Sequence, residues 1–272
     1  MIGNYGGRTQ TKNDYLVKAY LHLFHEVELG TRVRDCEFGF DDNSKQYFLS
    51  TKVSADNAEE ARRKGEHRLT QVLSVFAIHT GVSYTYVIGV DQISGEQPFF
   101  HYIFTGVTWE GCYPITNEKI SEVEKSIEIL DKLADERLSM VIERAINYFL
   151  RGCYLETRWP PESFLNFFKV IELVAQEFRG SFNQTIASQL KDTLFSGLTE
   201  EELERLRTLK RLVEFMCKQL DITGEDISRI FTLRSKFSAH AVLEEVVVSP
   251  EEFGSCKHLA QRTIINHIKQ KR

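Results

Sequence analysis

The sequence predicts an α+β protein with a small N-terminal α+β domain, residues 1–116, followed by an all-α helical bundle, residues 117–272. Three observations lead to this division. Aromatic and β-branched runs typical of strands concentrate in the first part. Helical periodicity and helix start signals dominate the second part. Between them, the segment Gly111–Asn117 (GCYPITN) combines Gly, Pro and Asn, as loops do.

Four strands are expected in the first part. The first, Tyr15–Arg34, shows apolar alternation and is expected to bend at Gly30. The second strand is Gln46–Val53. Two aromatic runs, Ser83–Val90 and Pro98–Trp109, supply the third and fourth.

One helix is expected between the second and third strands. Asp56 and Glu59 have the spacing of a capping box at its start. Apolar positions recur at helical spacing as far as Phe76, and the helix is expected to stop before Gly81. The first part therefore reads as four strands and one helix.

The aromatic side chains of the third and fourth strands allow two interpretations. A core packed against the helix is favoured over a face that stacks bases or binds a ligand. The residues concerned are Tyr84, Tyr86, Phe99, Phe100, Tyr102 and Phe104.

The second part begins with a long helical pattern, Ile120 to about Tyr154. Two prolines, Pro160 and Pro161, precede a helix over Glu162–Phe178, with Gly180 as its expected C-cap. A shorter amphipathic segment follows over 183–194.

Three further helices have recognisable start signals. Thr199 with Glu202 predicts a capping box for a helix that reaches about residue 220. Thr223 is expected to cap a helix from 226 to about 243. The clearest start is Ser249-Pro250, followed by two glutamates, for a helix that runs to the basic end at 267–272.

Composition excludes several classes of protein. Hydrophobic residues make up 42% of the 272 residues and charged residues 27%, which excludes disordered and fibrous chains. The formal charge of −5 excludes a protein that coats nucleic acid by its bulk charge, so any such binding needs a local patch. Nucleotide, hydride-transfer and serine or zinc hydrolase motifs are missing, and no cofactor is expected.

The cysteines and the apolar segments favour a cytoplasmic protein. Five widely spaced cysteines, without a zinc pattern, predict neither a disulfide framework nor a metal site. The N-terminus has no apolar stretch of the signal-peptide kind. The longest apolar-rich stretch, Val72–Val90, is interrupted by His79 and Gly81 and reads as a helix end plus a strand, so no membrane span is expected.

The segment IFTLRSKFSAHA, Ile230–Ala241, carries the chemistry of interest. A histidine such as His240 can take a proton from a ribose 2′-hydroxyl or protonate a leaving oxygen. An arginine such as Arg234 can hold a phosphate in a bidentate manner and stabilise its transition state. The plainer interpretation is a surface helix with one polar pair. The two residues are also six positions apart, which places their side chains on different sides of an ideal helix. A shared site therefore needs the helix to start or bend between them, or an interface between two copies of the chain.

This segment resembles the Arg-x(4–6)-His motif of HEPN domains, close to their common form in LRSKFSAHA. The preceding helices, Asn147–Ala175, are similar to the family's helix pair, in which a Pro-Glu start leads into an apolar run ending in Ile-Glu or Leu-Glu. The resemblance covers about residues 117–272 and no part of 1–116.

The resemblance implies a helical domain that dimerises so that two motifs meet in one cleft, without metal. It implies a metal-independent endoribonuclease of the toxin, antiphage or stress-effector kind, with RNA as substrate and a regulatory protein as a further partner. Arg234 would bind the phosphate and His240 would be catalytic. Ser235 would take the polar position beside the arginine, and Lys236 and Arg229 would bind substrate.

An alternative stays open. Some members of this family are inactive, and the serine at 235 departs from the usual Asn, Asp or His, so the domain could be an RNA-binding or dimerisation scaffold. Glu172 could approach the motif, although a structural or surface role is favoured. Two basic groups are read mainly as solvated or dipole-compensating residues: Arg205, Arg207, Lys210 and Arg211; and Lys257, His258, Arg262, His267, Lys269, Lys271 and Arg272.

Overall fold

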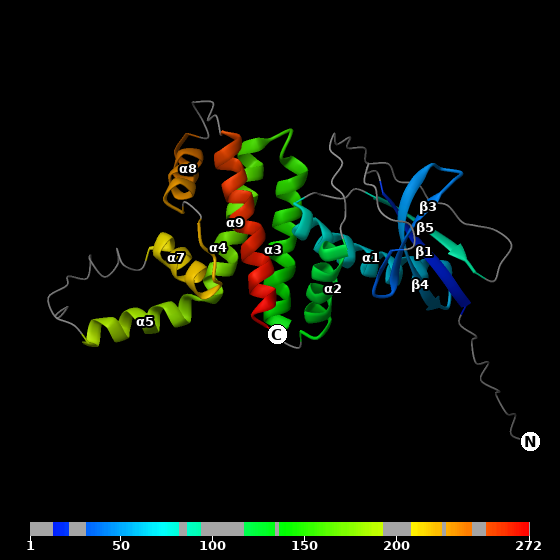
Figure 1. Cartoon of the computed structure of the whole chain (residues 1–272), viewed down its shortest axis with the longest axis horizontal. Helices are drawn as coiled ribbons and strands as arrows, with labels where there is room; N and C mark the ends of the chain where they lie inside the picture. Colours follow the sequence, from blue (N-terminus) through cyan, green and yellow to red (C-terminus); the bar gives the residue numbers. More distant parts are fainter. Residues whose placement is uncertain are drawn as a thin grey trace, which may run out of the picture. The chain divides into compact units, whose positions relative to one another are not determined.

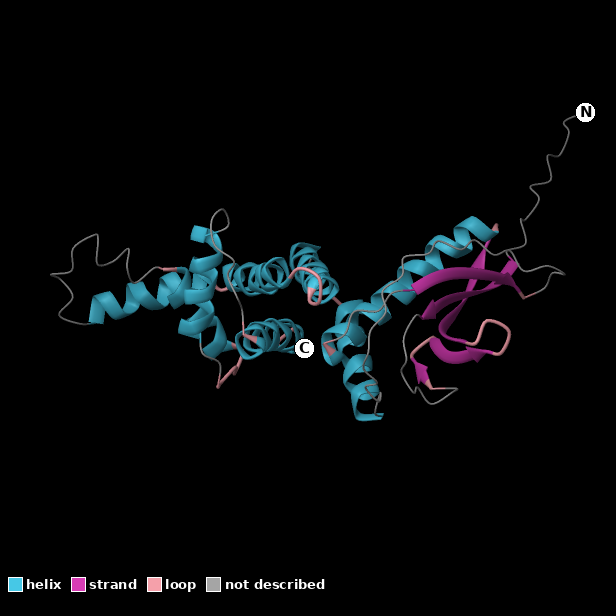
Figure 2. Ribbon diagram, turned by 90° about the horizontal axis from the view of Figure 1, so that it is seen from above, coloured by secondary structure: helices cyan, strands magenta, loops and turns pink. Residues whose placement is uncertain are grey.

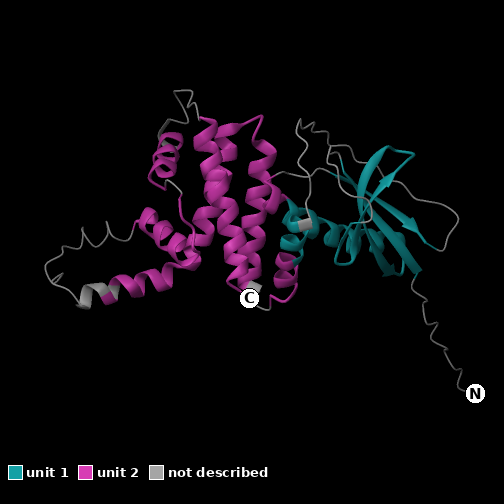
Figure 3. Cartoon of the chain, in the orientation of Figure 1, with its two compact units in different colours: residues 1–76, 84–124 teal, residues 77–83, 125–272 magenta. Residues whose placement is uncertain are grey.

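The computed structural model describes residues 13–21, 31–81, 86–93, 117–133, 136–192, 208–224, 227–240 and 249–271. The chain divides into two compact units (Figure 3). The first, here called the sheet unit, comprises residues 1–76 and 84–124. The second, the helical unit, comprises residues 77–83 and 125–272. The expected fold class, a small α+β part followed by helices, is confirmed.

The sheet unit is built on an antiparallel sheet with strand order β2-β3-β4-β1-β5 (Figure 1). The central strand β1 pairs with β4 from Asn13 opposite Ala55 to Leu21 opposite Tyr47. On its other side β1 pairs with β5. The strands are β1 (Asn13–Leu21), β2 (Arg32–Val33), β3 (Cys36–Asp41), β4 (Gln46–Ala55) and β5 (Tyr86–Gln92).

Helix α1 (Ala58–Thr80) covers one face of this sheet (Figure 2). Gly65 allows the helix to approach β1 closely, because a Cβ at that position would lie 2.5 Å from Val17 Cβ. Further along, Phe76 meets Phe38 of β3 edge-to-face, with ring centroids 5.5 Å apart. The side chain of Tyr86, the one described member of the aromatic set, is half-buried and hydrogen-bonds Thr70 of α1 at 2.5 Å.

Three expectations for this unit need correction. Strand β3 was not expected. The expected first strand, Tyr15–Arg34, is not one strand, because β1 and β2 occupy separate positions in the sheet with β3 and β4 between them. The capping box assigned to Asp56 and Glu59 is also wrong by one residue, because the Asn57 side chain accepts the hydrogen bond from the Glu60 backbone. The expected strand Pro98–Trp109 lies outside the described residues, as does the second half of the expected first strand up to residue 30.

The helical unit is a bundle in which α4 packs against both α3 and α9 (Figure 1). Its core is aromatic, with Phe149, Phe164, Phe167 and Phe168 fully or almost fully buried. The described helices assigned wholly or partly to this unit are α2 (Asn117–Asp131), α3 (Glu136–Leu155), α4 (Pro160–Glu177), α5 (Arg179–Asp192), α7 (Leu209–Gln219), α8 (Ile227–His240) and α9 (Pro250–Lys269).

The long helix expected from Ile120 to Tyr154 is two helices, α2 and α3. After Asp131 the backbone changes to a tighter turn, with Leu133 N–H bonded to the Leu130 carbonyl. Buried residues before and after the break, Ile127 and Leu138, are eleven positions apart. Eleven residues complete about three helical turns, so the apolar pattern stays in phase across the break and periodicity does not reveal it.

The helix ends show one wrong prediction and one confirmed prediction. Gly180 does not cap α4, since Phe178 ends that helix and Gly180 lies inside α5. Ser249 caps α9 through a full capping box with Glu252, as expected. The expected cap at Thr199 lies outside the described residues, and the described helix α7 begins with Thr208 as its N-cap.

No described helix is long and apolar enough to cross a membrane. Four described cysteines, Cys36, Cys153, Cys217 and Cys256, are buried free thiols. Burial raises the pKa of the Cys153 thiol to about 12, which makes it a poor nucleophile.

Candidate functional site

The candidate site is centred on Arg234, in the middle of α8. Its guanidinium lies 3.7 Å from a carboxylate oxygen of Glu172 on α4. The guanidinium carbon also lies 5.7 Å from the centre of the Phe168 ring, within cation–π range. The Arg234 side chain remains 42% exposed. Glu172 and Phe168 therefore orient the guanidinium without covering it.

Aromatic packing places α8 against α4. Phe237 packs on Phe164 with ring centroids 5.1 Å apart, and Phe231 meets Phe168 edge-to-face at 5.2 Å. Both pairs lie on the α4-facing side of α8, so the position of Arg234 is set by a rigid helix–helix contact.

The other motif residues have different surroundings. The exposed Ser235 donates its hydroxyl to the Phe231 carbonyl one turn earlier, at 3.0 Å. Arg229 donates from Nε to a carboxylate oxygen of Glu252 at 3.1 Å. Lys236 is exposed. His240 is the last residue of α8, and its side chain lies outside the described residues.

Because α8 is described as one helix from Ile227 to His240, the helix neither begins nor breaks between Arg234 and His240. Six residues of α-helix place the two positions about 120° apart around the axis and about 9 Å apart along it. By the same arithmetic, Arg229, Lys236 and His240 fall on one face of α8. The structure thus brings three of the predicted site residues to one face and turns Arg234 toward α4.

The sequence identified Arg234 but missed Phe168 as its neighbour and favoured a structural or surface role for Glu172. Phe168 carries no sequence signal beyond an apolar helical position. Glu172 is separated from Arg234 by 62 positions, and their contact depends on how α4 and α8 pack. The only sequence hint of this contact was the position of Glu172, an acidic residue late in an otherwise apolar helix.

The C-terminal basic set does not form a single surface. His267 is buried in the helical core, and burial lowers its pKa to about 4. Lys257 forms an ion pair with Glu156 at 2.5 Å. Arg262 donates to the Thr223 carbonyl at 2.7 Å. These residues support the fold of the helical unit.

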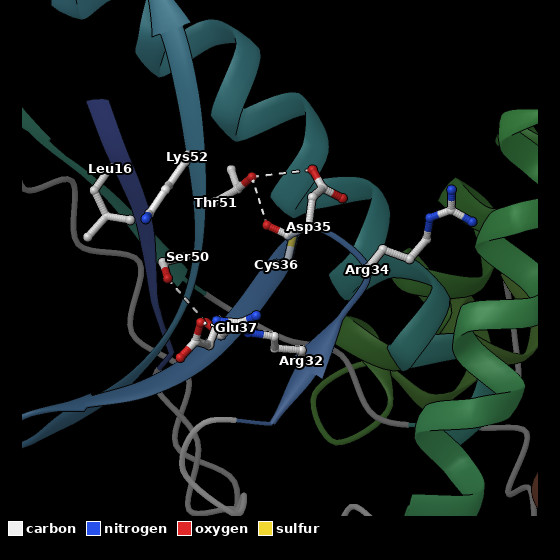
Figure 4. A pocket seen from close by; sticks show the side chains of 9 residues that line it. All are labelled: Leu16, Arg32, Arg34, Asp35, Cys36, Glu37, Ser50, Thr51 and Lys52. Atoms are coloured by element: carbon white, nitrogen blue, oxygen red, sulfur yellow. Dashed lines mark hydrogen bonds and ion pairs between the residues drawn. The ribbon is translucent and has the colours of Figure 1, made fainter. Parts of the chain in front are cut away.

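A separate pocket of about 300 Å³ lies in the sheet unit, beside the β2–β3 turn (Figure 4). Its charged side chains come from β2, β3, the turn between them and β4. Figure 4 shows Thr51 bonded to Asp35 and Ser50 bonded to the Glu37 backbone. The charged lining residues are Arg32, Arg34, Asp35, Glu37 and Lys52.

Ion pairs balance much of the charge in this pocket. Arg32 contacts Glu37 at 3.1 Å, and Arg68 of α1 contacts Asp35 at 2.7 Å. Burial acts to raise the pKa of Asp35, but the hydrogen bonds that its carboxylate accepts, together with the positive charge of Arg68, outweigh burial and hold that pKa below its usual value. Burial and the Asp35 charge raise the pKa of the Cys36 thiol to about 12. The pocket thus presents neither a reactive thiol nor an unusual acid.

Within the described part of the chain, no group of three or more His, Cys, Asp or Glu side chains is placed to hold a metal ion. Comparison of the chain with protein-family models, curated proteins and solved structures finds no match.

Proposed function

We propose that the helical unit is a HEPN-like endoribonuclease that cleaves RNA without a metal ion, with Arg234 and His240 as its catalytic residues. The observation that carries the proposal is the half-exposed guanidinium of Arg234, held between Glu172 and the Phe168 ring. A fixed, solvent-accessible guanidinium is suited to binding a phosphate through two parallel hydrogen bonds.

The reaction would begin with attack of a ribose 2′-oxygen on the adjacent phosphorus. The 2′-hydroxyl loses its proton, an O2′–P bond forms, and the P–O5′ bond breaks as the leaving oxygen gains a proton. His240 would serve one or both proton transfers, since an imidazole with an ordinary pKa does so near neutral pH. Arg234 would stabilise the additional negative charge on the phosphorus oxygens.

The helix geometry of α8 favours a site shared between two copies of the chain. Within one copy, Arg234 and His240 lie about 120° apart around the helix. In a two-fold dimer, each surface meets its own counterpart, so Arg234 of one copy can face His240 of the partner. The proposed nuclease is therefore a homodimer that joins through the helical unit.

An inactive scaffold is the second candidate, and two contacts favour it. Glu172 already neutralises part of the charge of Arg234, and the Ser235 hydroxyl is bonded to its own helix. In this version the helical unit would bind RNA or dimerise without cleaving.

The test is incubation of the full chain with single-stranded RNA in EDTA, alongside a His240→Ala variant. The proposal predicts cleavage by the unaltered protein, products ending in 2′,3′-cyclic phosphate, and loss of cleavage in the variant. Equal cleavage by both proteins would overturn the catalytic assignment. RNA binding without cleavage by either protein would favour the scaffold.

A further inference from the structure

Four arginines recur at seven-residue intervals along helix α3 and just beyond its end, and neither the fold nor the proposed catalysis explains them. Arg137, Arg144 and Arg151 lie on the helix and Arg158 lies three residues beyond its end. All four are exposed. This regular series stands out because the chain as a whole carries a formal charge of −5.

Helix geometry aligns the arginines of α3 along one stripe. Seven residues advance about 10.5 Å along the axis and fall about 20° short of two full turns. The core-facing residues of α3 lie on the opposite side of the helix. They are Leu138, Ile142, Ala145, Ile146, Phe149 and Cys153, all buried. The arginine stripe therefore faces away from the core.

Large apolar side chains are interleaved with these arginines. Met140 is 51% exposed and Tyr154 is 40% exposed, and both lie between successive arginines of the series. Trp159, next to Arg158, is 57% exposed. These exposed side chains lie close in sequence to the arginines and leave apolar area in water, which a ligand would cover.

Acidic side chains do little to neutralise this stripe. Arg137 contacts Glu177 of α4 at 3.3 Å. Arg144, Arg151 and Arg158 form no ion pair with any residue that the structure describes. No acid lies three or four positions from Arg144 or Arg151 on the helix, where partners would meet them.

We propose that this outward face of α3 binds single-stranded RNA. Guanidinium groups pair with phosphates, and exposed aromatic rings stack on unpaired bases, so alternation of the two suits a single strand. A duplex hides its bases from such rings. An acidic protein would match the charges but would not use the stacking surfaces in this way.

The same surface continues toward Arg234, and this step rests on the proposed function. Lys169 of α4 lies over the Tyr148 ring of α3, with Nζ 5.4 Å from its centre. Lys169 and Glu172 are three residues apart on α4, so they share a side of that helix. Glu172 in turn contacts Arg234. A strand held on α3 could thus extend across α4 to the catalytic residues.

The test compares two full-length proteins that share the His240→Ala change, so that no RNA is cut during the measurement. The first adds Arg144→Gln, Arg151→Gln and Arg158→Gln. The second is a control with the same charge change elsewhere on the helical unit: Lys125→Gln, Arg179→Gln and Lys218→Gln, at exposed positions of α2, α5 and α7. Fluorescence polarisation with a labelled, unstructured RNA of about 20 nucleotides reports the Kd across a salt series.

The proposal predicts binding weaker by about tenfold or more in the stripe variant, with little change in the control. The slope of log K against log salt should fall by about 2, the value for three lost contacts to a single strand. Tyr154→Leu with Trp159→Leu should weaken binding by about fivefold or more while leaving that slope unchanged.

Three outcomes would overturn the proposal: equal loss in the stripe and control variants, tighter binding of an RNA duplex than of the single strand, or binding of anionic lipid vesicles without binding of RNA. Since every protein in the series carries His240→Ala, the result does not depend on cleavage. Weak binding by the stripe variant would support the surface even if the nuclease assignment fails.

Discussion

Both units contain ion pairs among their described residues, and the helical unit adds a row of exposed arginines along α3. In the sheet unit, arginines and lysines are close to carboxylates, as in the pairs Arg32–Glu37, Arg68–Asp35 and Lys18–Asp91. In the helical unit, the arginines of α3 are exposed, and the Arg234 side chain is 42% exposed beside Glu172. The sheet-unit pairs link strands and helix, whereas Arg144 and Arg151 of α3 form no ion pair with any residue that the structure describes.

Buried polar groups follow the same division. In the sheet unit, the buried hydroxyls of Ser50 and Thr51 donate to backbone carbonyls of β3 and the turn before it. In the helical unit, neither ring nitrogen of buried His267 has a hydrogen-bond partner among the described residues. The helical unit thus holds a buried imidazole that no described hydrogen bond satisfies, alongside its aromatic core.

The largest expected effect is on cleavage, at Arg234. Arg234→Ala should lower the cleavage rate in EDTA by about 10²–10³-fold, because it removes a fixed donor pair from the transition state. Arg234→Lys should restore little, since an ammonium lacks the planar fork. Single-turnover rates at saturating protein measure the effect, with circular dichroism as the check on folding.

The matched change in the sheet unit is Arg32→Ala, which also removes an exposed arginine beside a carboxylate. It should leave cleavage unchanged. If Arg32→Ala lowered the cleavage rate as much as Arg234→Ala, cleavage would no longer distinguish the helical unit from the sheet unit.

The next effect concerns acid stability and His267. Burial lowers its pKa to about 4 from about 6.5, so between those values the unfolded chain binds a proton that the folded chain does not. The contribution of neutral His267 to the free energy of unfolding is therefore present above pH 6.5 and is lost as the pH falls toward 4. At pH 5 the loss from this group is about 2 kcal/mol. Urea unfolding at pH 7 and pH 5 measures it.

His267→Leu keeps the side-chain volume roughly constant and removes the titration. The variant should lose about 2 kcal/mol less than the unaltered protein between pH 7 and pH 5. Identical pH dependence in the two proteins would show that the imidazole is protonated in the folded state.

The smallest expected effect lies at the Asp35–Arg68 pair. Asp35→Asn should lower the stability of the sheet unit by about 1 kcal/mol, since the Asp35 side chain is 54% exposed and water screens the lost pair. RNA binding should stay the same. Thermal unfolding and the polarisation assay test both halves of this prediction, and weaker RNA binding would count against a purely structural role.

Local sequence signals predicted much of the fold, because caps and periodicity act over a few residues. Ser249 and Glu252 are three positions apart, and their capping box formed as expected. Strand β3, which contains Gly39, was not expected. In the structure, the absence of a side chain at Gly39 makes room for the Phe48 ring on the neighbouring strand, a reason visible only after pairing.

The candidate site was predictable in part. A short motif identified Arg234, but its contact with Glu172 arises from packing between helices distant in sequence. The arginines at 137, 144, 151 and 158 could have been found by counting intervals of seven. Their meaning depends on which side of α3 is buried, and the structure shows that the apolar side, opposite the arginines, is the buried one.

The central claim is that Arg234 of one copy acts with His240 of the partner, and a mixed dimer tests it most directly. Arg234→Ala and His240→Ala chains with different affinity tags are co-expressed, and the heterodimer is purified. Each homodimer should be inactive, whereas the heterodimer retains one intact site and should cleave RNA at about half the unaltered rate. A stable heterodimer that fails to cleave, beside an active unaltered dimer, would contradict the shared site.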